Sequence, residues 1–151
     1  MKKLTTIIAL MLITISASAQ LTEGRRPFAF LGSSADPMNN YALSFEAGVW
    51  GTAKATSYSI TYDRMVSSTG TGSNWVGIKP YFTIFDNGEI SYMLYTSPKI
   101  NVESGERMIE FGFNPNYTVS NNLLFGVTLG NQVTPTGQWN MFLGVGFVIL
   151  K

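Results

Sequence analysis

Residues 122–132 read Asn-Leu-Leu-Phe-Gly-Val-Thr-Leu-Gly-Asn-Gln, and this stretch decides the fold class. Large apolar residues occupy every second position from Leu123 to Leu129, whereas glycine, threonine or a second leucine fills the positions between them. A period of two places the two sets on opposite faces of an extended strand. The stretch therefore predicts a β-strand with one bulky apolar face and one face of smaller side chains.

The same alternation recurs along the chain. It is longest at 139–149, which is enough to cross a bilayer at a tilt, since a crossing strand takes about 9–11 residues. Five earlier segments repeat it, at 43–49, 55–62, 76–84, 90–95 and 108–114. Single-chain bacterial barrels have an even number of strands, so we expect an eighth strand at Pro27–Ser33.

The connections between these segments alternate between long and short. The long ones are expected at 34–40, 66–74, 98–105 and 133–137, and the short ones at 51–52, 86–88 and 120–121. Asn87-Gly88 is a strong hairpin signal, because both residues tolerate the positive φ of a tight turn. Outer-membrane barrels have short periplasmic turns and longer extracellular loops, and a chain that enters from the periplasm fits this order. The expected fold is thus all-β, an eight-stranded antiparallel up-and-down transmembrane β-barrel.

The N-terminus has the features of a cleaved secretory signal. Lys2 and Lys3 precede an apolar run from Ile7 to Ile15, and Ser16-Ala17-Ser18-Ala19 resembles a cleavage site. Residues 1–19 are therefore expected to be removed, and residues 20–151 to form a single barrel domain. Without the two lysines, eight basic residues face nine acidic ones, a net charge of 8 − 9 = −1, which gives no reason to expect nucleic acid as a partner.

Charge indicates which face of the strands points to the barrel axis. On the small or polar faces of the seven clear strands only Glu46, Lys79 and Glu110 are charged, too few for a surface in contact with water. We therefore expect the apolar faces to contact lipid and these three residues to pair inside a narrow lumen, since buried charges must be paired. The competing interpretation is a soluble periplasmic barrel with an apolar lumen, as in lipocalins.

Three further features carry expectations. Pro80 interrupts a strand that a closed barrel cannot place at an edge, which predicts a bulge or a break there. The adjacent Asp63 and Arg64 are expected to form a surface ion pair. Six aromatic residues near strand ends are expected to form girdles at the headgroup boundary: Tyr41, Trp50, Tyr62, Trp75, Tyr117 and Trp139.

The layout resembles the small eight-stranded outer-membrane barrels of the OmpA/OmpX-like group, in the form found in Bacteroidetes-type outer-membrane proteins. The resemblance covers Pro27 to Lys151 and rests on the signal ending in Ser18-Ala19-Gln20, the eight strands and the terminal-strand motif Gly144-Val145-Gly146-Phe147. It implies a location in the outer membrane of a Gram-negative cell envelope.

Functional chemistry is sparse. The chain has no His and no Cys, which removes the commonest general base and the thiol nucleophile, and we expect no enzyme activity, cofactor or metal. A catalytic mechanism based on two carboxylates would have to use Glu46 and Glu110, the only inward acidic residues in mid-strand. We prefer the interpretation that they belong to an ion-pair network that fills the lumen. The expected function is a structural or surface-interaction role, as a monomer in outer-membrane lipid, with an extracellular ligand or protein met through the long loops. The alternatives are a soluble carrier of an apolar ligand and a narrow outer-membrane pore.

Overall fold

The computed structural model describes residues 25–38, 40–51, 57–137 and 139–151. The expected signal peptide at 1–19 and its cleavage site lie outside the described residues. Within the described ranges, the structure contains no helix whose length and apolar character would let it cross a membrane.

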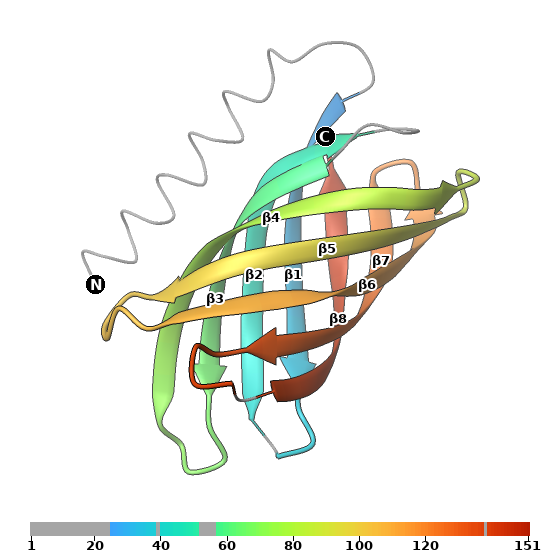
Figure 1. Cartoon of the computed structure of the whole chain (residues 1–151). Coiled ribbons are helices and arrows are strands. Elements are labelled where there is room, and N and C mark those ends of the chain that lie inside the picture. Colours follow the sequence, from blue (N-terminus) through green and yellow to red (C-terminus); the bar gives the residue numbers. More distant parts are fainter. Residues whose placement is uncertain (1–24, 39, 52–56, 138) are drawn as a thin grey trace.

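Eight antiparallel strands form one closed barrel in which each strand pairs with its neighbours in the sequence (Figure 1). The strands are β1 Arg25–Ala35, β2 Tyr41–Gly51, β3 Ser57–Val66, β4 Gly72–Asp86, β5 Ile90–Asn101, β6 Arg107–Ser120, β7 Leu123–Val133 and β8 Trp139–Leu150. The ladder between β1 and β8 closes the barrel, and it runs from Phe28 opposite Leu150 to Ala35 opposite Leu143. The eight-stranded up-and-down barrel is confirmed, including the first strand predicted at Pro27–Ser33, because closure gives this segment two partners.

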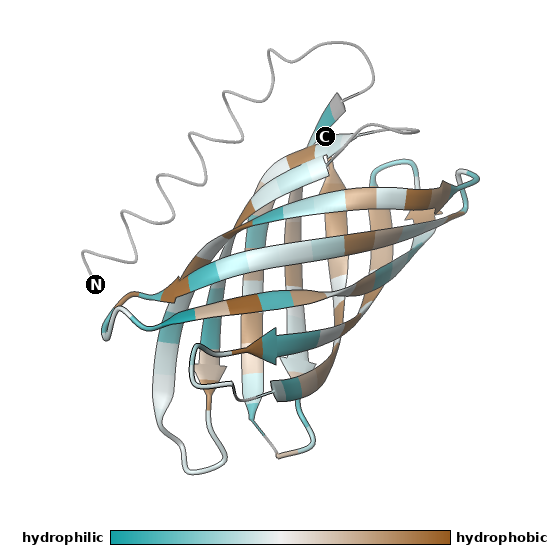
Figure 2. Cartoon of the chain, in the orientation of Figure 1, coloured by the Kyte–Doolittle hydropathy of each residue, from teal (hydrophilic) through white to brown (hydrophobic). Residues whose placement is uncertain are grey.

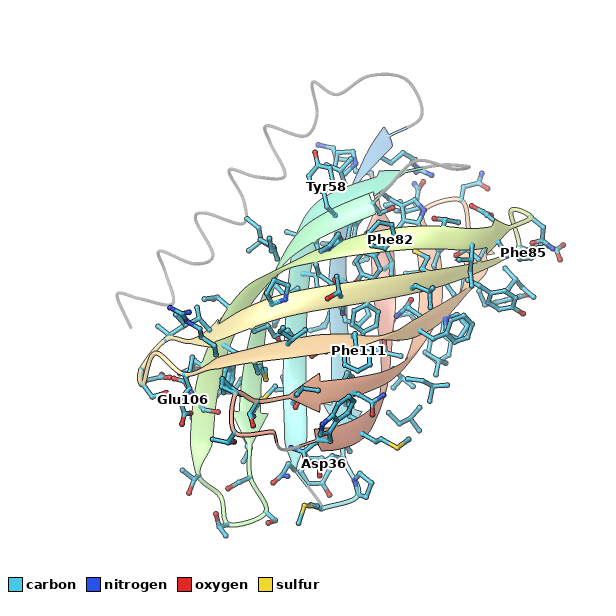
Figure 3. The ribbon with its side chains drawn as sticks, in the orientation of Figure 1. Asp36, Tyr58, Phe82, Phe85, Glu106 and Phe111 are labelled. Atoms are coloured by element: carbon cyan, nitrogen blue, oxygen red, sulfur yellow. The ribbon has the colours of Figure 1, made fainter. Side chains whose placement is uncertain are left out.

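The outer wall of the barrel is apolar, and the buried charged side chains lie inside it. Leu129 on β7 is 50% exposed, whereas Glu46 on β2 is 3% exposed. Figure 2 shows the alternation of brown and teal along the strands, and Figure 3 places Phe82 and Phe111 on the outer wall. The period-two faces predicted from the sequence are thus in the orientation expected of a barrel in lipid. Ala47 and Val49 are buried although they share the outward phase of β2.

An aromatic and aliphatic cluster fills the lumen towards the end where the chain enters and leaves the barrel. Its buried members are Phe28, Trp50, Tyr81, Met93, Tyr95, Leu124, Val148 and Leu150. The rings of Phe28 and Trp50 meet edge to face, with their centroids 5.7 Å apart. Such edge-to-face pairs stabilise a core beyond the area that they bury. This cluster closes the barrel interior as a packed core.

The predicted aromatic girdle is wrong for two of its tryptophans. Trp50 and Trp75 are 5% and 7% exposed, because each follows the inward phase of its strand and no local twist turns it outward. Trp139, Tyr41 and Tyr117 are exposed on the outer wall, as the girdle prediction requires.

Glycine inside the barrel gives the lumen side chains their space. A Cβ atom at Gly130 would lie 2.3 Å from Cζ of Phe142 and 2.5 Å from the Tyr95 hydroxyl oxygen. No real Cβ tolerates such distances, so the ring of Phe142 rests directly against the backbone of β7. The inward glycines therefore reflect close packing of side chains rather than flexibility.

Strand β4 continues through Pro80 without a bulge, but its ladder to β5 is interrupted there, so of the two expected irregularities the structure has the break in pairing and not the bulge. Strand β4 keeps one register against β5 across it, with Gly77 opposite Lys99 and Tyr81 opposite Tyr95. The described ladder has no β5 partner for the residues between Gly77 and Tyr81, so the missing N–H of proline falls in a gap of the ladder. The register shift of β4 lies instead between Thr83 and Phe85.

Three of the four loops expected to be long are shorter than predicted, whereas the fourth keeps its predicted length and begins one residue later. The connections at the end opposite the chain termini are 36–40, 67–71, 102–106 and 134–138. The clearest difference is the predicted loop 98–105, of which Pro98 to Asn101 belong to β5 because Pro98 stays in the ladder opposite Ile109. We call this end the loop end and the other the turn end. At the turn end, 87–89 and 121–122 connect strands, with Gly88 at a φ of 88°.

Candidate functional site

Five charged side chains form a chain of ion pairs across the lumen. They come from five different strands, and acid and base alternate along it in the order Glu46, Lys79, Glu110, Lys99 and Asp63. The successive nitrogen–oxygen distances are 2.7 Å, 3.7 Å, 2.5 Å and 2.7 Å. We call this set the lumen network. Its side chains are 1–6% exposed, so water contributes little to their solvation.

The structure brings together the three residues singled out from the sequence. Lys79 lies between the two glutamates, 2.7 Å from Glu46 and 3.7 Å from Glu110. Sequence reasoning missed the other two members. The sequence pattern predicts a loop at Lys99 and a surface pair between Asp63 and Arg64, whereas both Lys99 and Asp63 lie in the lumen.

Asp63 points inward, and the predicted surface pair with Arg64 is wrong. Consecutive residues of a strand face opposite sides, so Asp63 is buried while Arg64 is exposed. Asp63 accepts a hydrogen bond from the Ser44 hydroxyl at 2.5 Å and meets Lys99. The period-two phase of β3, extended by one step beyond Thr61, would have identified Asp63, and the same step beyond Ser97 on β5 would have identified Lys99.

Uncharged side chains make further hydrogen bonds and contacts with the lumen network. The Ser59 hydroxyl donates to Glu46 at 3.0 Å, and the Tyr81 hydroxyl donates to the same carboxylate. The ammonium of Lys79 lies 4.2 Å from the centroid of the Tyr95 ring, within the range of a cation–π interaction. The network thus joins the charged part of the lumen to the aromatic cluster beside it.

Little free space remains beside the lumen network. The cavity next to Glu46, Asp63 and Lys79 measures about 20 Å³, room for about one water molecule. Every carboxylate of the network contacts a lysine, and among the described residues no group of acidic side chains is arranged to hold a metal ion. The arrangement is suited to tying five strands together, because each lysine bridges carboxylates from two other strands.

A second polar cluster lies at the rim of the loop end and centres on Asn74. Its side-chain oxygen accepts from the Tyr62 hydroxyl at 2.7 Å and from the Arg64 guanidinium at 3.1 Å. Its backbone N–H donates to Glu103 in the β5–β6 loop at 3.1 Å, and its side-chain amide donates to the same carboxylate. These hydrogen bonds from Asn74 lower the pKa of Glu103 from its ordinary value of 4.5. We call this cluster the rim latch, because it fastens the loop to β3 and β4.

Comparison with known proteins gives similarity in fold alone. No protein-family model matches the chain, and no curated protein matches it. Among solved structures, the designed transmembrane barrel TMB2.3 is similar over 86% of this chain and 98% of its own, with a TM-score of 0.61 and 14% identity. The N-terminal β-barrel domain of Pseudomonas aeruginosa OprF is similar over 83% of this chain and 98% of its own, with a TM-score of 0.59 and 16% identity. Neisserial surface protein A is similar over 83% and 94%, with a TM-score of 0.57 and 10% identity.

Proposed function

We propose that this chain is an integral outer-membrane β-barrel with a structural or surface-interaction role and no catalytic activity. The observation that carries the proposal is the distribution of polarity. Large side chains such as Leu143, 54% exposed, and Phe147, 50% exposed, cover the wall, while the five charges of the lumen network lie inside. Such a wall would be costly in water, since soluble proteins rarely expose large contiguous apolar patches. In a bilayer it would contact acyl chains.

The soluble carrier is not favoured by this arrangement. A lipocalin-like barrel holds its ligand in an apolar lumen and presents polar residues to water. Here the lumen holds the aromatic cluster and the lumen network, and the space beside the network is about 20 Å³. An apolar ligand would have to displace packed rings or paired charges.

A narrow pore is likewise disfavoured, because the same packing blocks the axis. Eight strands leave an interior just wide enough for side chains. Conductance in planar bilayers is the direct test of this alternative, and folded protein that conducts would exclude the purely structural role.

We propose the loop end as the region that contacts a partner. Its four connections are short and one of them is fastened by the rim latch, so we expect recognition on a rigid surface rather than by mobile loops. Folding as a monomer, the Bacteroidetes-type affiliation and an extracellular partner remain predictions.

The experiment that tests the proposal is cell fractionation followed by electrophoresis of unheated and boiled samples. We expect the protein in the outer-membrane fraction and a band that shifts on boiling, because a folded barrel resists detergent until heated. Release by osmotic shock without detergent would contradict the membrane location and favour the soluble alternative.

A further inference from the structure

An apolar groove crosses the outer wall towards the loop end. The strand register builds it: Ile60 lies opposite Ile78, Val76 opposite Ile100, and Ile109 opposite both Pro98 and Val133. All of these residues line a single depression of about 750 Å³, which Pro135 of the β7–β8 loop borders. We call it the wall groove. This volume lies within the range of about 300 to 1,000 Å³ of small-molecule sites, and the groove is open along the wall rather than enclosed.

Arg107 lies at one border of the wall groove. It is exposed at the start of β6, opposite Ile100 in the ladder and two residues before Ile109. Among the described residues no ion pair involves Arg107. Lys99 also borders the groove, but its ammonium points into the lumen, where it pairs with Asp63 and Glu110. The groove therefore combines an apolar floor with one available cation.

The nearby carboxylates have other partners. Glu103 accepts hydrogen bonds from Asn74, and Glu106 accepts from the Ser104 hydroxyl at 3.3 Å. Figure 3 shows Glu106 at the tip of the β5–β6 hairpin. The guanidinium of Arg107 therefore remains the charged group that a bound molecule would meet at the groove.

The exposed tryptophan Trp139 near the groove indicates how deep in a membrane the groove would lie. Trp139 lies opposite Val133 in the β7–β8 ladder, is 66% exposed, and meets the Phe111 ring edge to face at 5.9 Å. Exposed tryptophan of a membrane protein lies at the headgroup boundary. Arg107 lies on β6, two strands from β8 and at the same end of the barrel. It would reach the phosphates of the leaflet on the loop side, while the groove floor extends towards the acyl chains.

We propose that the wall groove binds an acyl lipid whose phosphate headgroup carries a net negative charge, with Arg107 on the phosphate and the acyl chain in the groove. This inference rests on the proposed membrane location. Guanidinium and phosphate form charge-assisted, often bidentate hydrogen bonds, and the apolar floor supplies contacts that a free phosphate lacks.

The test uses the full chain in vesicles of phosphatidylcholine and phosphatidic acid with identical acyl chains in equal amounts. The protein is extracted in mild detergent and its retained lipid is counted by native mass spectrometry. We expect phosphatidic acid to be enriched over phosphatidylcholine. Arg107→Gln should lower that enrichment about tenfold, the effect expected on losing a hydrogen bond to a charged group, and Arg107→Lys should restore part of it.

Arg64→Gln is the matched control, because Arg64 is also an exposed arginine of the loop end but already binds Asn74. Val133→Trp fills the groove and should reduce retention of both lipids while Arg107 stays in place. Equal enrichment in the wild type and Arg107→Gln, an equal loss in Arg64→Gln, or displacement of the lipid by excess inorganic phosphate would overturn the proposal. A barrel that inserts and shifts on boiling but shows no lipid preference refutes the groove alone, whereas failure to insert refutes the proposed function.

Discussion

Replacement of Lys99 by methionine should destabilise the folded barrel more than any change of an exposed charge. The ammonium of Lys99 contacts Asp63 at 2.7 Å and Glu110 at 2.5 Å, and all three side chains are at most 5% exposed. Lys99→Met leaves Asp63 with the Ser44 hydroxyl as its remaining donor and changes the lumen network from two lysines against three acids to one against three. Removing one partner of a buried ion pair costs about 3–5 kcal/mol, mostly because the other charge remains buried without compensation.

The assay is reversible urea unfolding of the barrel in lipid vesicles, followed by tryptophan fluorescence. The double variant Lys99→Met with Asp63→Leu should recover a large part of the loss, because Glu46, Lys79 and Glu110 remain paired in it. A cost below about 1 kcal/mol for Lys99→Met, the range of exposed pairs, would refute the reasoning, since it would mean that water solvates the lumen network.

Three further predictions concern packing, orientation and the rim latch. Gly130→Ala should cost about 1–3 kcal/mol in the same urea assay, because the new methyl would meet packed lumen side chains, and an unchanged free energy of unfolding would contradict the close packing. In variants that keep a single tryptophan, brominated lipid should quench the fluorescence of Trp139, which is 66% exposed, and leave the fluorescence of Trp50, which is 5% exposed, unchanged. Quenching of Trp50 and not of Trp139 would contradict the assignment of the outer and inner faces. Because the pKa of Glu103 is lowered, its contact with Asn74 stabilises the rim latch at pH values above the ordinary pKa of 4.5 and is lost as the pH falls through the lowered pKa. An NMR titration of the Asn74 amide should therefore have its midpoint below pH 4.5. A midpoint at or above pH 4.5 would argue against the latch.

The strand pattern could be predicted because a closed barrel with an apolar wall and a narrow lumen imposes a strict alternation. Each outward position must be apolar and each inward position must fit a crowded axis, so one segment such as Leu123–Val133 shows the period without any knowledge of its partners. The same constraint identified Glu46 and Lys79, since a charge in mid-strand on the small face has to be inside.

The strand ends were harder to predict, and both missed members of the lumen network lie near them. The sequence predicts that a loop begins at Pro98, which places Lys99 outside the strand. In the structure, proline is tolerated in the ladder opposite Ile109, and Lys99 belongs to β5. Adjacency in the sequence suggests a pair between Asp63 and Arg64, but adjacent strand residues face opposite sides. The wall groove could not be predicted from one strand, because it exists only once the register across β3 to β7 is known.

The combination of a packed aromatic cluster and a chain of ion pairs has a physical consequence for the barrel. The backbone ladders hold neighbouring strands together, and the contacts in the lumen add links between strands that are not neighbours, such as β2 and β4. Each bridging lysine fixes two carboxylates on different strands, and each fixed distance restricts the register of the sheet. We therefore expect variants of the lumen network to affect folding, while conservative changes on the wall are tolerated.

Site-directed spin labelling along β8 tests most directly the claim that the apolar faces of the strands point outward to lipid. Because the sequence contains no cysteine, each single-cysteine variant is labelled at one position only. In vesicles, labels at Met141, Leu143 and Val145 should be accessible to oxygen dissolved in the lipid and shielded from a water-soluble relaxation agent. Labels at Phe142 and Gly144 should be shielded from oxygen. Accessibility that alternates in this phase is the result that the account predicts. Odd-numbered positions that respond to the water-soluble agent instead, or a profile without a period of two, would contradict it.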